Sequence, residues 1–364
     1  MKKSLIFGSI LLLLGVLSAC TATDPNNLFA VTTVVATTST DCALVPFEEL
    51  QTGNEYYQYG NMQKNVPSGS FMLWGNEVLF QYLSGGNKRL YCYDLTTGEV
   101  ESYCKDATCQ HNGCVASRLL GNLEVYNGKL YTMTFERIPA EIDGTDKKKL
   151  TKAKVDGFFH HEGKLYARSA DSALVVYEEG NDEPRIVVEE FTGHWEVIFD
   201  QYLYANDGYC VMRIDLTAEK PDIETVISNA GGITDGHHIY YTDRKTWYLY
   251  RCDMDGSNVR LLLDKPVLLA SINFDDEYFY YRLYTDYQLD DGPDTYDIYR
   301  FPKSDPAKIE KLATLPVPAY QVFTVPGTDK LFVNTRVRSN GEDDDIYVMN
   351  TDGSSIIRLE IPEY

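Results

Sequence analysis

Three features of the 364-residue sequence predict an all-β fold. Tyrosine is unusually abundant, with 28 residues, and aromatic side chains favour strands. Short segments rich in aromatic and β-branched residues recur along the chain. Turn dipeptides such as Asp-Gly follow several of these segments, and such turns need the positive φ that glycine tolerates. The stretch 235–264 combines the three features most regularly.

This stretch predicts most of one repeating unit. His238–Thr242 and Trp247–Cys252 are expected to form two strands separated by a polar turn. Asp255-Gly256 then predicts a tight hairpin turn into a further strand at Val259–Leu263. The short segment Ala230–Thr234, which consists mostly of small residues, suits a strand in a crowded position. One unit is therefore expected to be a four-stranded antiparallel sheet.

Segments equivalent to His238–Tyr240 occur seven times, at intervals of 35 to 52 residues with a mean of about 42. They are Glu77–Phe80, Lys129–Tyr131, Lys164–Tyr166, Tyr202–Tyr204, His238–Tyr240, Tyr278–Tyr280 and Lys330–Phe332. This interval is typical of four strands per blade in a β-propeller. The sequence predicts a β-propeller over residues 43–364, with seven blades and with six or eight as alternatives. Closure of the ring would protect the sheet edges.

The N-terminus has the features of an export signal. Lys2-Lys3 precedes an apolar segment, Leu5–Val16, that is too short to be an ordinary membrane-spanning helix. The motif Leu17-Ser18-Ala19-Cys20 that follows resembles the lipobox of bacterial lipoproteins. The resemblance implies that residues 1–19 are a signal peptide and that Cys20 is diacylated. A secretory signal with a coincidental cysteine is the alternative.

A lipid on Cys20 would hold the protein at the extracytoplasmic face of the cell membrane. Each buried methylene of an acyl chain contributes about 0.8 kcal/mol, so several chains anchor a protein firmly. Residues 20–42 are rich in threonine and are expected to form a flexible tether. The lipid bilayer is therefore one expected partner.

The net charge of −21 limits the other partners. We find no dense patch of lysine and arginine in the sequence, so nucleic acid is not an expected partner, and neither is a membrane bound through basic residues. The acidity itself is consistent either with solubility alone or with an acidic functional surface.

Two short motifs resemble known propeller repeats. Ile239–Asp243, followed by Asp255–Asn258, is similar to the YWTD repeats of low-density-lipoprotein-receptor propellers. Tyr347–Gly353 resembles the repeats of TolB-type propellers. As a whole, residues 71–359 resemble a group of Gram-positive lipoproteins that carry such propellers. The chain departs from YWTD propellers in its seven repeats and in Tyr241, which replaces tryptophan. The resemblance implies a fold and says little about function.

One irregular segment contains several potential metal ligands. Cys104, Cys109, His111 and Cys114 follow the pattern C-x4-C-x-H-x2-C, and three thiols with one imidazole can surround a tetrahedral zinc ion. A disulfide between two of these cysteines is an equal alternative outside the cell, and free thiols are a third. Apart from Cys20 the chain has seven cysteines, so at least one is free, bound to a metal or paired between molecules.

The remaining cysteines and histidines predict no chemistry. Cys92, Cys210 and Cys252 are expected to be small buried residues in strands. The pairs His160-His161 and His237-His238 precede repeat strands and are expected at the surface or in turns. The sequence lacks G-x-S-x-G, H-E-x-x-H and phosphate-loop motifs, so no catalytic residue is assigned and catalysis is disfavoured.

Long loops indicate a binding face. The longest insertions between second and third strands are expected at Glu136–Lys149, Tyr284–Tyr296 and Arg336–Asp344. In an antiparallel blade these loops emerge on the same face as the connections between blades, which include the cysteine segment. The residues expected to supply stacking surfaces, carboxylates and anion donors there are Tyr284, Tyr287, Asp290, Asp291, Asp294, Tyr296, Arg336 and Arg338. Solvated loops without a function are the alternative.

Three functions are consistent with these features. The first is a non-catalytic binding or scaffolding module for an extracellular protein, peptide or glycan. The second is a lyase or hydrolase that acts on extracellular polysaccharide or peptide within the propeller. The third is an accessory protein in envelope assembly or sensing. Zinc at the cysteine segment is the one cofactor considered.

Overall fold

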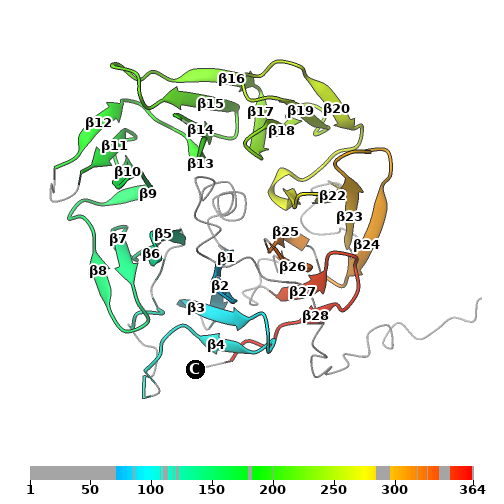
Figure 1. The fold of residues 1–364 in the computed structure, drawn as a ribbon, viewed down its shortest axis with the longest axis horizontal. Helices are drawn as coiled ribbons and strands as arrows, with labels where there is room; N and C mark the ends of the chain where they lie inside the picture. Colours follow the sequence, from blue (N-terminus) through cyan, green and yellow to red (C-terminus); the bar gives the residue numbers. More distant parts are fainter. Residues whose placement is uncertain are drawn as a thin grey trace, which may run out of the picture. The chain divides into compact units, whose positions relative to one another are not determined.

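The computed structural model describes residues 71–84, 87–106, 108–109, 114–117, 119, 123–178, 183–199, 201–283, 296–317, 319–325, 327–335 and 345–362. These residues form seven four-stranded antiparallel sheets, which follow one another around a ring (Figure 1). The prediction of a seven-bladed β-propeller is confirmed. In this part of the chain no helix is long and apolar enough to cross a membrane.

Each blade consists of four consecutive strands. Blade 1 contains β1 (Phe71–Trp74), β2 (Glu77–Ser84), β3 (Asn87–Asp94) and β4 (Val100–Ser102). Blade 2 contains β5 (Glu124–Tyr126), β6 (Lys129–Met133), β7 (Pro139–Ile142) and β8 (Lys147–Lys149). Blade 3 contains β9 (Val155–His161), β10 (Lys164–Ser169), β11 (Leu174–Tyr177) and β12 (Arg185–Val188). Blade 4 contains β13 (His194–Phe199), β14 (Tyr202–Asn206), β15 (Cys210–Asp215) and β16 (Glu224–Ser228).

The remaining three blades repeat this order. Blade 5 contains β17 (Ala230–Thr234), β18 (His238–Asp243), β19 (Leu249–Asp253) and β20 (Arg260–Leu263). Blade 6 follows the short 3₁₀ helix η2 (Leu269–Ser271) and contains β21 (Asn273–Phe274), β22 (Tyr278–Arg282), β23 (Tyr296–Pro302) and β24 (Glu310–Leu315). Blade 7 contains β25 (Ala319–Thr324), β26 (Lys330–Thr335), β27 (Ile346–Asn350) and β28 (Ile357–Arg358).

All seven repeat segments found in the sequence lie in the second strand of a blade. In the stretch 235–264 the largest difference from the prediction is that β19 begins at Leu249 and not at Trp247, while the other strand ends differ by one residue at most. Trp247 has a φ of 59°, which a strand does not allow, and its N–H donates to the carbonyl oxygen of Asp243 at 2.7 Å. Trp247 therefore closes the turn that precedes the strand.

The insertion expected at Glu136–Lys149 does not exist, and that prediction was wrong. The segment contains β7 and β8, and β6 connects to β7 through the short turn 134–138. Pro139 and the lysine-rich sequence of β8 give weak strand signals, because proline and lysine are depleted in strands. Both strands nevertheless pair in register, with Ile142 opposite Leu130 and opposite Lys147.

Blades 1 and 7 meet through side chains. Among the described residues every sheet contains consecutive strands, so no strand of one end of the chain joins the sheet of the other. The ring centroid of Phe71 lies 4.9 Å from that of Phe323 and 5.5 Å from that of Phe332. Tyr93 packs edge-on against Phe332 at 5.2 Å, and the Tyr91 hydroxyl donates to the Pro362 carbonyl oxygen at 3.3 Å. An aromatic cluster thus closes the ring.

A polar position recurs between the blades. The fifth residue of the second strand is Met133 in blade 2 and polar in the other six blades. The six polar residues are Gln81, Arg168, Asn206, Thr242, Arg282 and Asn334. Three of them donate to a carbonyl oxygen of the next blade. The distances are 3.2 Å from Arg168 to Gly193, 3.2 Å from Asn206 to Gly232 and 2.6 Å from Arg282 to Ala319. These bonds join blade 3 to blade 4, blade 4 to blade 5 and blade 6 to blade 7.

Glycine allows the outer strands of neighbouring blades to approach closely. Gly256 and Gly353 lie in turns between third and fourth strands, and both have a φ of +85°. A Cβ at Gly256 would lie 2.7 Å from the carbonyl oxygen of Val226 in the preceding blade. At Gly353 the distance to the Leu312 carbonyl oxygen would be 2.5 Å. Both distances are shorter than van der Waals contact, so a side chain would push the blades apart.

We expect Gly256→Ala and Gly353→Ala each to lower the free energy of unfolding by about 2–4 kcal/mol, since backbone strain and steric overlap add. Gly75→Ala is the matched control, because Gly75 has a φ of +60° and open space around its Cβ position. Gly75→Ala should lower the free energy of unfolding only by the backbone strain, about 1–2 kcal/mol. Thermal or denaturant unfolding measures the three differences. Equal losses for all three variants would contradict the close approach of the blades.

Candidate metal centre and loop face

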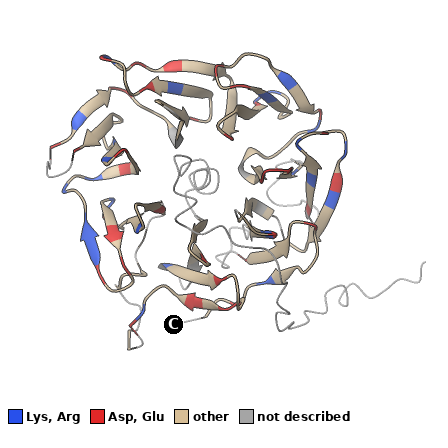
Figure 2. Ribbon diagram, viewed as in Figure 1, with Lys and Arg blue, Asp and Glu red and all other residues tan. Residues whose placement is uncertain are grey.

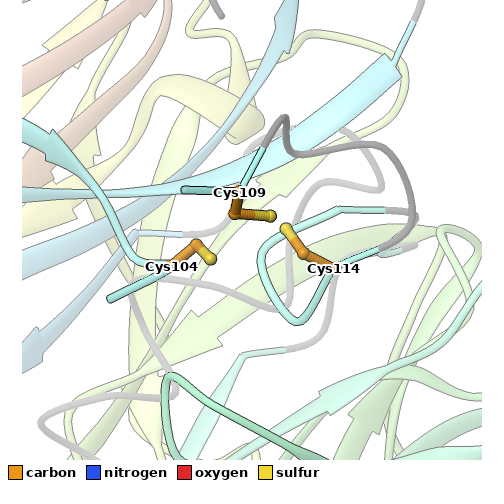
Figure 3. Close-up of side chains that lie close together, drawn as sticks. All are labelled: Cys104, Cys109 and Cys114. Carbon is orange, nitrogen blue, oxygen red and sulfur yellow. The ribbon is translucent and has the colours of Figure 1, made fainter. Parts of the chain in front are cut away.

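Cys104, Cys109 and Cys114 lie together in the connection between β4 and β5, which spans residues 103–123. Their three sulfur atoms are within 4.8 Å of one another, and the side chains point toward a common centre (Figure 3). This is the one group of three or more His, Cys, Asp or Glu side chains in the described residues whose ligand atoms converge in this way. His111, the fourth predicted ligand, lies outside the described residues.

A turn centred on Asp106 brings the first two cysteines together. The Asp106 carboxylate accepts from the N–H and the hydroxyl of Thr108 at 2.9 and 2.7 Å. The Asp106 carbonyl oxygen accepts from the N–H of Cys109 at 3.0 Å. Aspartate favours such turns because its side chain bonds the backbone two residues later. The chain therefore reverses between Cys104 and Cys109.

The connection is held on both neighbouring blades. On the side of blade 1, the N–H of Tyr103 donates to the Leu90 carbonyl oxygen at 3.0 Å, and the Leu90 N–H donates to Ala116 at 2.8 Å. On the side of blade 2, the N–H of Lys105 donates to Gly144 at 3.3 Å. The Lys147 ammonium group donates to the carbonyl oxygen of Ser117 at 2.7 Å. The cysteines thus lie at the junction of blades 1 and 2.

The thiol chemistry fits a divalent metal ion. The pKa of the Cys104 thiol is raised to about 11, mainly by burial, while the backbone N–H of Asp106 lowers it. Hydrogen bonds to the Cys109 and Cys114 thiols contribute to the increase. A dication would offset these costs by stabilising thiolates, and metal–sulfur bonds of about 2.3 Å require sulfurs roughly 3.8 Å apart. The cysteine triad can therefore bind a metal.

The other cysteines and histidines differ partly from prediction. Cys92 and Cys252 are buried in strands as expected, whereas Cys210 is half-buried. His160 is not a surface residue, and that prediction was wrong. It is 8% exposed in β9, and its Nδ1 lies 2.9 Å from a carboxylate oxygen of Glu124. No local sequence pattern predicts this contact, because Glu124 belongs to the neighbouring blade and lies 36 residues before His160.

The loops between second and third strands and the connections between blades emerge on one face of the ring, because strand direction alternates within each blade. We call this the loop face, and the other the turn face. The cysteine connection lies on the loop face, and β22 and β26 end there before residues 284–295 and 336–344. The clustering of these loops stays a prediction, because both lie outside the described residues.

Most of the predicted binding residues lie outside the described residues as well, and so does Cys20. The binding residues concerned are Tyr284, Tyr287, Asp290, Asp291, Asp294, Arg336 and Arg338. Tyr296 begins β23, where its backbone pairs with Leu315, and its side chain is not described.

Two aromatic residues on the loop face were missed in the sequence. Phe135 is 68% exposed in the turn between β6 and β7, and Tyr209 is 67% exposed in the turn between β14 and β15. In the described chain the other large hydrophobic residues that are strongly exposed lie on or beside outer strands, and they are Ile186, Val259, Leu261, Ile309 and Ile357. Tyr209 directly follows the turn sequence Asn-Asp-Gly. An aromatic residue beside a predicted turn was the sequence feature that could have identified it.

Charged residues of both signs are distributed around the ring (Figure 2). The outer strand β8 is the most basic strand, with three consecutive lysines. Lys147 is bonded to Ser117, and Lys149 forms an ion pair with Glu136. The expectation of no dense basic cluster did not include this short strand, and two of its lysines are bound in internal contacts.

The triad should bind one equivalent of Co²⁺ or Zn²⁺ per reduced chain, and cobalt should show intense sulfur-to-metal charge-transfer absorption. Cys109→Ser should weaken binding by at least about tenfold, since one of three thiolates is lost. Cys252→Ser, in a buried strand position, is the matched control and should bind as the native chain does. Equal binding by both variants, or no binding by the native chain, would contradict the assignment.

The comparisons with known proteins bear on the fold. The chain matches no protein-family model and no curated protein sequence. Among solved structures it is similar to the propeller domain of the Trilobed protease from Pyrococcus furiosus, with 10% identity and a TM-score of 0.53 over 82% of this chain and 99% of that one.

Two further structures show less similarity. The computationally designed protein Ika8 has 10% identity and a TM-score of 0.43 over 82% of this chain and 100% of that one. An oligogalacturonate lyase from Vibrio parahaemolyticus has 14% identity and a TM-score of 0.34 over 78% of this chain and 74% of that one. The similarity to the Trilobed protease domain, together with the ring of seven sheets, establishes a β-propeller.

Proposed function

We propose that this protein is a non-catalytic binding propeller, anchored by lipid at Cys20 on the extracytoplasmic face of the cell membrane. The ligand is a protein, peptide or glycan recognised at the loop face. The observation that carries the proposal is the exposure of Phe135 and Tyr209, both of which lie on that face. Binding residues are concentrated on loops of rigid scaffolds, and aromatic residues are enriched at interfaces.

The turns that carry these residues have defined backbones. Arg137, with a φ of 64°, closes the Phe135 turn by donating its N–H to Thr134 at 2.8 Å. The Thr134 hydroxyl also bonds the Ile138 carbonyl oxygen at 3.0 Å. Leu119, from the cysteine connection, forms an isolated β-bridge with Thr134. Phe135 is therefore presented to solvent by a fixed turn that pairs with the cysteine connection.

Zinc is the metal proposed for the cysteine triad. Zinc binds thiolates in tetrahedral sites and has no redox chemistry, which suits a protein outside the cell. Cys104, Cys109 and Cys114 would supply three ligands, and His111 is proposed as the fourth. At the junction of blades 1 and 2 its role would be structural. Elemental analysis of the purified chain distinguishes zinc from other metals, and oxidised thiols without metal would favour a disulfide.

The test of the binding function is a screen of glycans and envelope proteins against the full-length chain in detergent. Hydrogen–deuterium exchange with the ligand that binds should show protection in peptides that contain Phe135 and Tyr209. A peptide that contains Ile357, exposed on the outer strand β28, is the control and should not change. Protection confined to the turn face or to outer strands would contradict the proposal.

A further inference from the structure

Tyr209 is held in place by several backbone hydrogen bonds. The Asp207 carboxylate accepts from the N–H groups of Tyr209 and Cys210 at 2.7 and 2.8 Å. The Gly208 N–H donates to the side chain of Asn206 at 2.6 Å, and the Tyr209 carbonyl oxygen accepts from Ala230 at 3.1 Å. The ring is nevertheless 67% exposed. The turn therefore presents the ring in a defined position.

An arginine from the next blade covers part of the ring. The Arg244 guanidinium carbon lies 4.0 Å from the Tyr209 ring centroid. The Arg244 Nη1 donates to the Gly208 carbonyl oxygen at 2.7 Å, and the Arg244 backbone N–H donates to Asn229 at 3.0 Å. Contacts from two blades thus fix the tyrosine and the guanidinium as one unit, which we call the Tyr209–Arg244 platform.

Other arginines that stack on tyrosine in the described chain have carboxylate partners. Arg213 lies over Tyr202 at 5.0 Å and forms two hydrogen bonds with Glu224, at 2.6 and 3.0 Å. Arg300 lies over Tyr278 at 4.3 Å and bonds Glu310 at 2.9 Å. Arg244 forms no ion pair with any described residue. Its charge is therefore available to an anionic ligand, unlike those of Arg213 and Arg300.

We propose that the Tyr209–Arg244 platform binds a carboxylated pyranose, which is an acidic sugar residue of a glycan. The inference rests on the proposed binding function and names its ligand class. The Nε and Nη2 edge of Arg244 can form two parallel hydrogen bonds with a carboxylate, while Nη1 stays on Gly208. The electron-rich face of Tyr209 attracts the C–H groups of a sugar ring.

The surroundings favour a glycan over a protein partner. A stable protein interface buries about 800 Å² on each side and has an apolar centre. In the described part of the loop face, the strongly exposed large hydrophobic residues are Phe135 and Tyr209, and they belong to blades 2 and 4. A separate flat ring with polar neighbours offers a surface suited to one sugar residue.

The test is isothermal titration calorimetry of the full-length chain in detergent with a hyaluronan hexasaccharide, which carries glucuronate. Its carboxyl-reduced form is the neutral probe. Tyr209→Ala and Arg244→Ala should each weaken binding of the acidic probe by about tenfold or more, and Tyr209→Phe should keep it within about twofold. Tyr202→Ala, at the tyrosine–arginine pair on the turn face of the same blade, is the matched control and should bind normally.

Each outcome decides the inference. The proposal is overturned if the native chain does not bind the hexasaccharide at millimolar concentration, or if Tyr209→Ala binds it as the native chain does. Equal affinity for the neutral probe would overturn the role of Arg244. These results leave the loop-face function intact, because that function fails only if deuterium protection by a bound ligand lies on another face.

Discussion

The packing of blade 1 against blade 7 is the contact on which the rest of the propeller depends. A ring of sheets is stable only if its first and last members meet, and within the described chain these two share no strand. Phe71 therefore has to close the ring by packing on Phe323 and Phe332. All three side chains are at most 1% exposed, so their burial supplies hydrophobic free energy at this junction. Aromatic contacts across it add a defined geometry.

Closure of the ring matters for function because the loops of the loop face are positioned by the blades that the ring holds together. Polar side chains of second strands join blades 3 and 4, 4 and 5, and 6 and 7, and glycine turns allow the outer strands of two of these pairs to approach closely. Other contacts between neighbouring blades position the candidate sites. The cysteine connection is bonded to blades 1 and 2, and the Tyr209–Arg244 platform joins blades 4 and 5. Each site is therefore formed across a junction, and a displaced blade would alter it.

Much of the fold could be predicted from the sequence, because one blade is a local unit. Alternating strand residues and Asp-Gly turns act over a few positions, so the second strands were located in all seven blades. The third and fourth strands of blade 2 were not located, since Pro139 and the lysines of β8 are poor strand formers. They become strands only because β7 pairs with β6 and β8 pairs with β7. The cysteine triad was also recognisable, because its members lie within eleven residues. By contrast, the Glu124–His160 and Tyr209–Arg244 contacts join different blades, which no local pattern reports.

The most direct test of ring closure is a double-mutant cycle on Phe71 and Phe332, measured by denaturant unfolding. If these residues close the ring by packing on each other, their truncations to alanine should be coupled by about 1 kcal/mol or more. Phe279 of blade 6 packs against Tyr240 of blade 5 and Phe301 of its own blade. The same cycle on Phe71 and Phe279 should therefore show additive losses of unfolding free energy. Additive losses for Phe71 and Phe332 would contradict closure by this aromatic cluster.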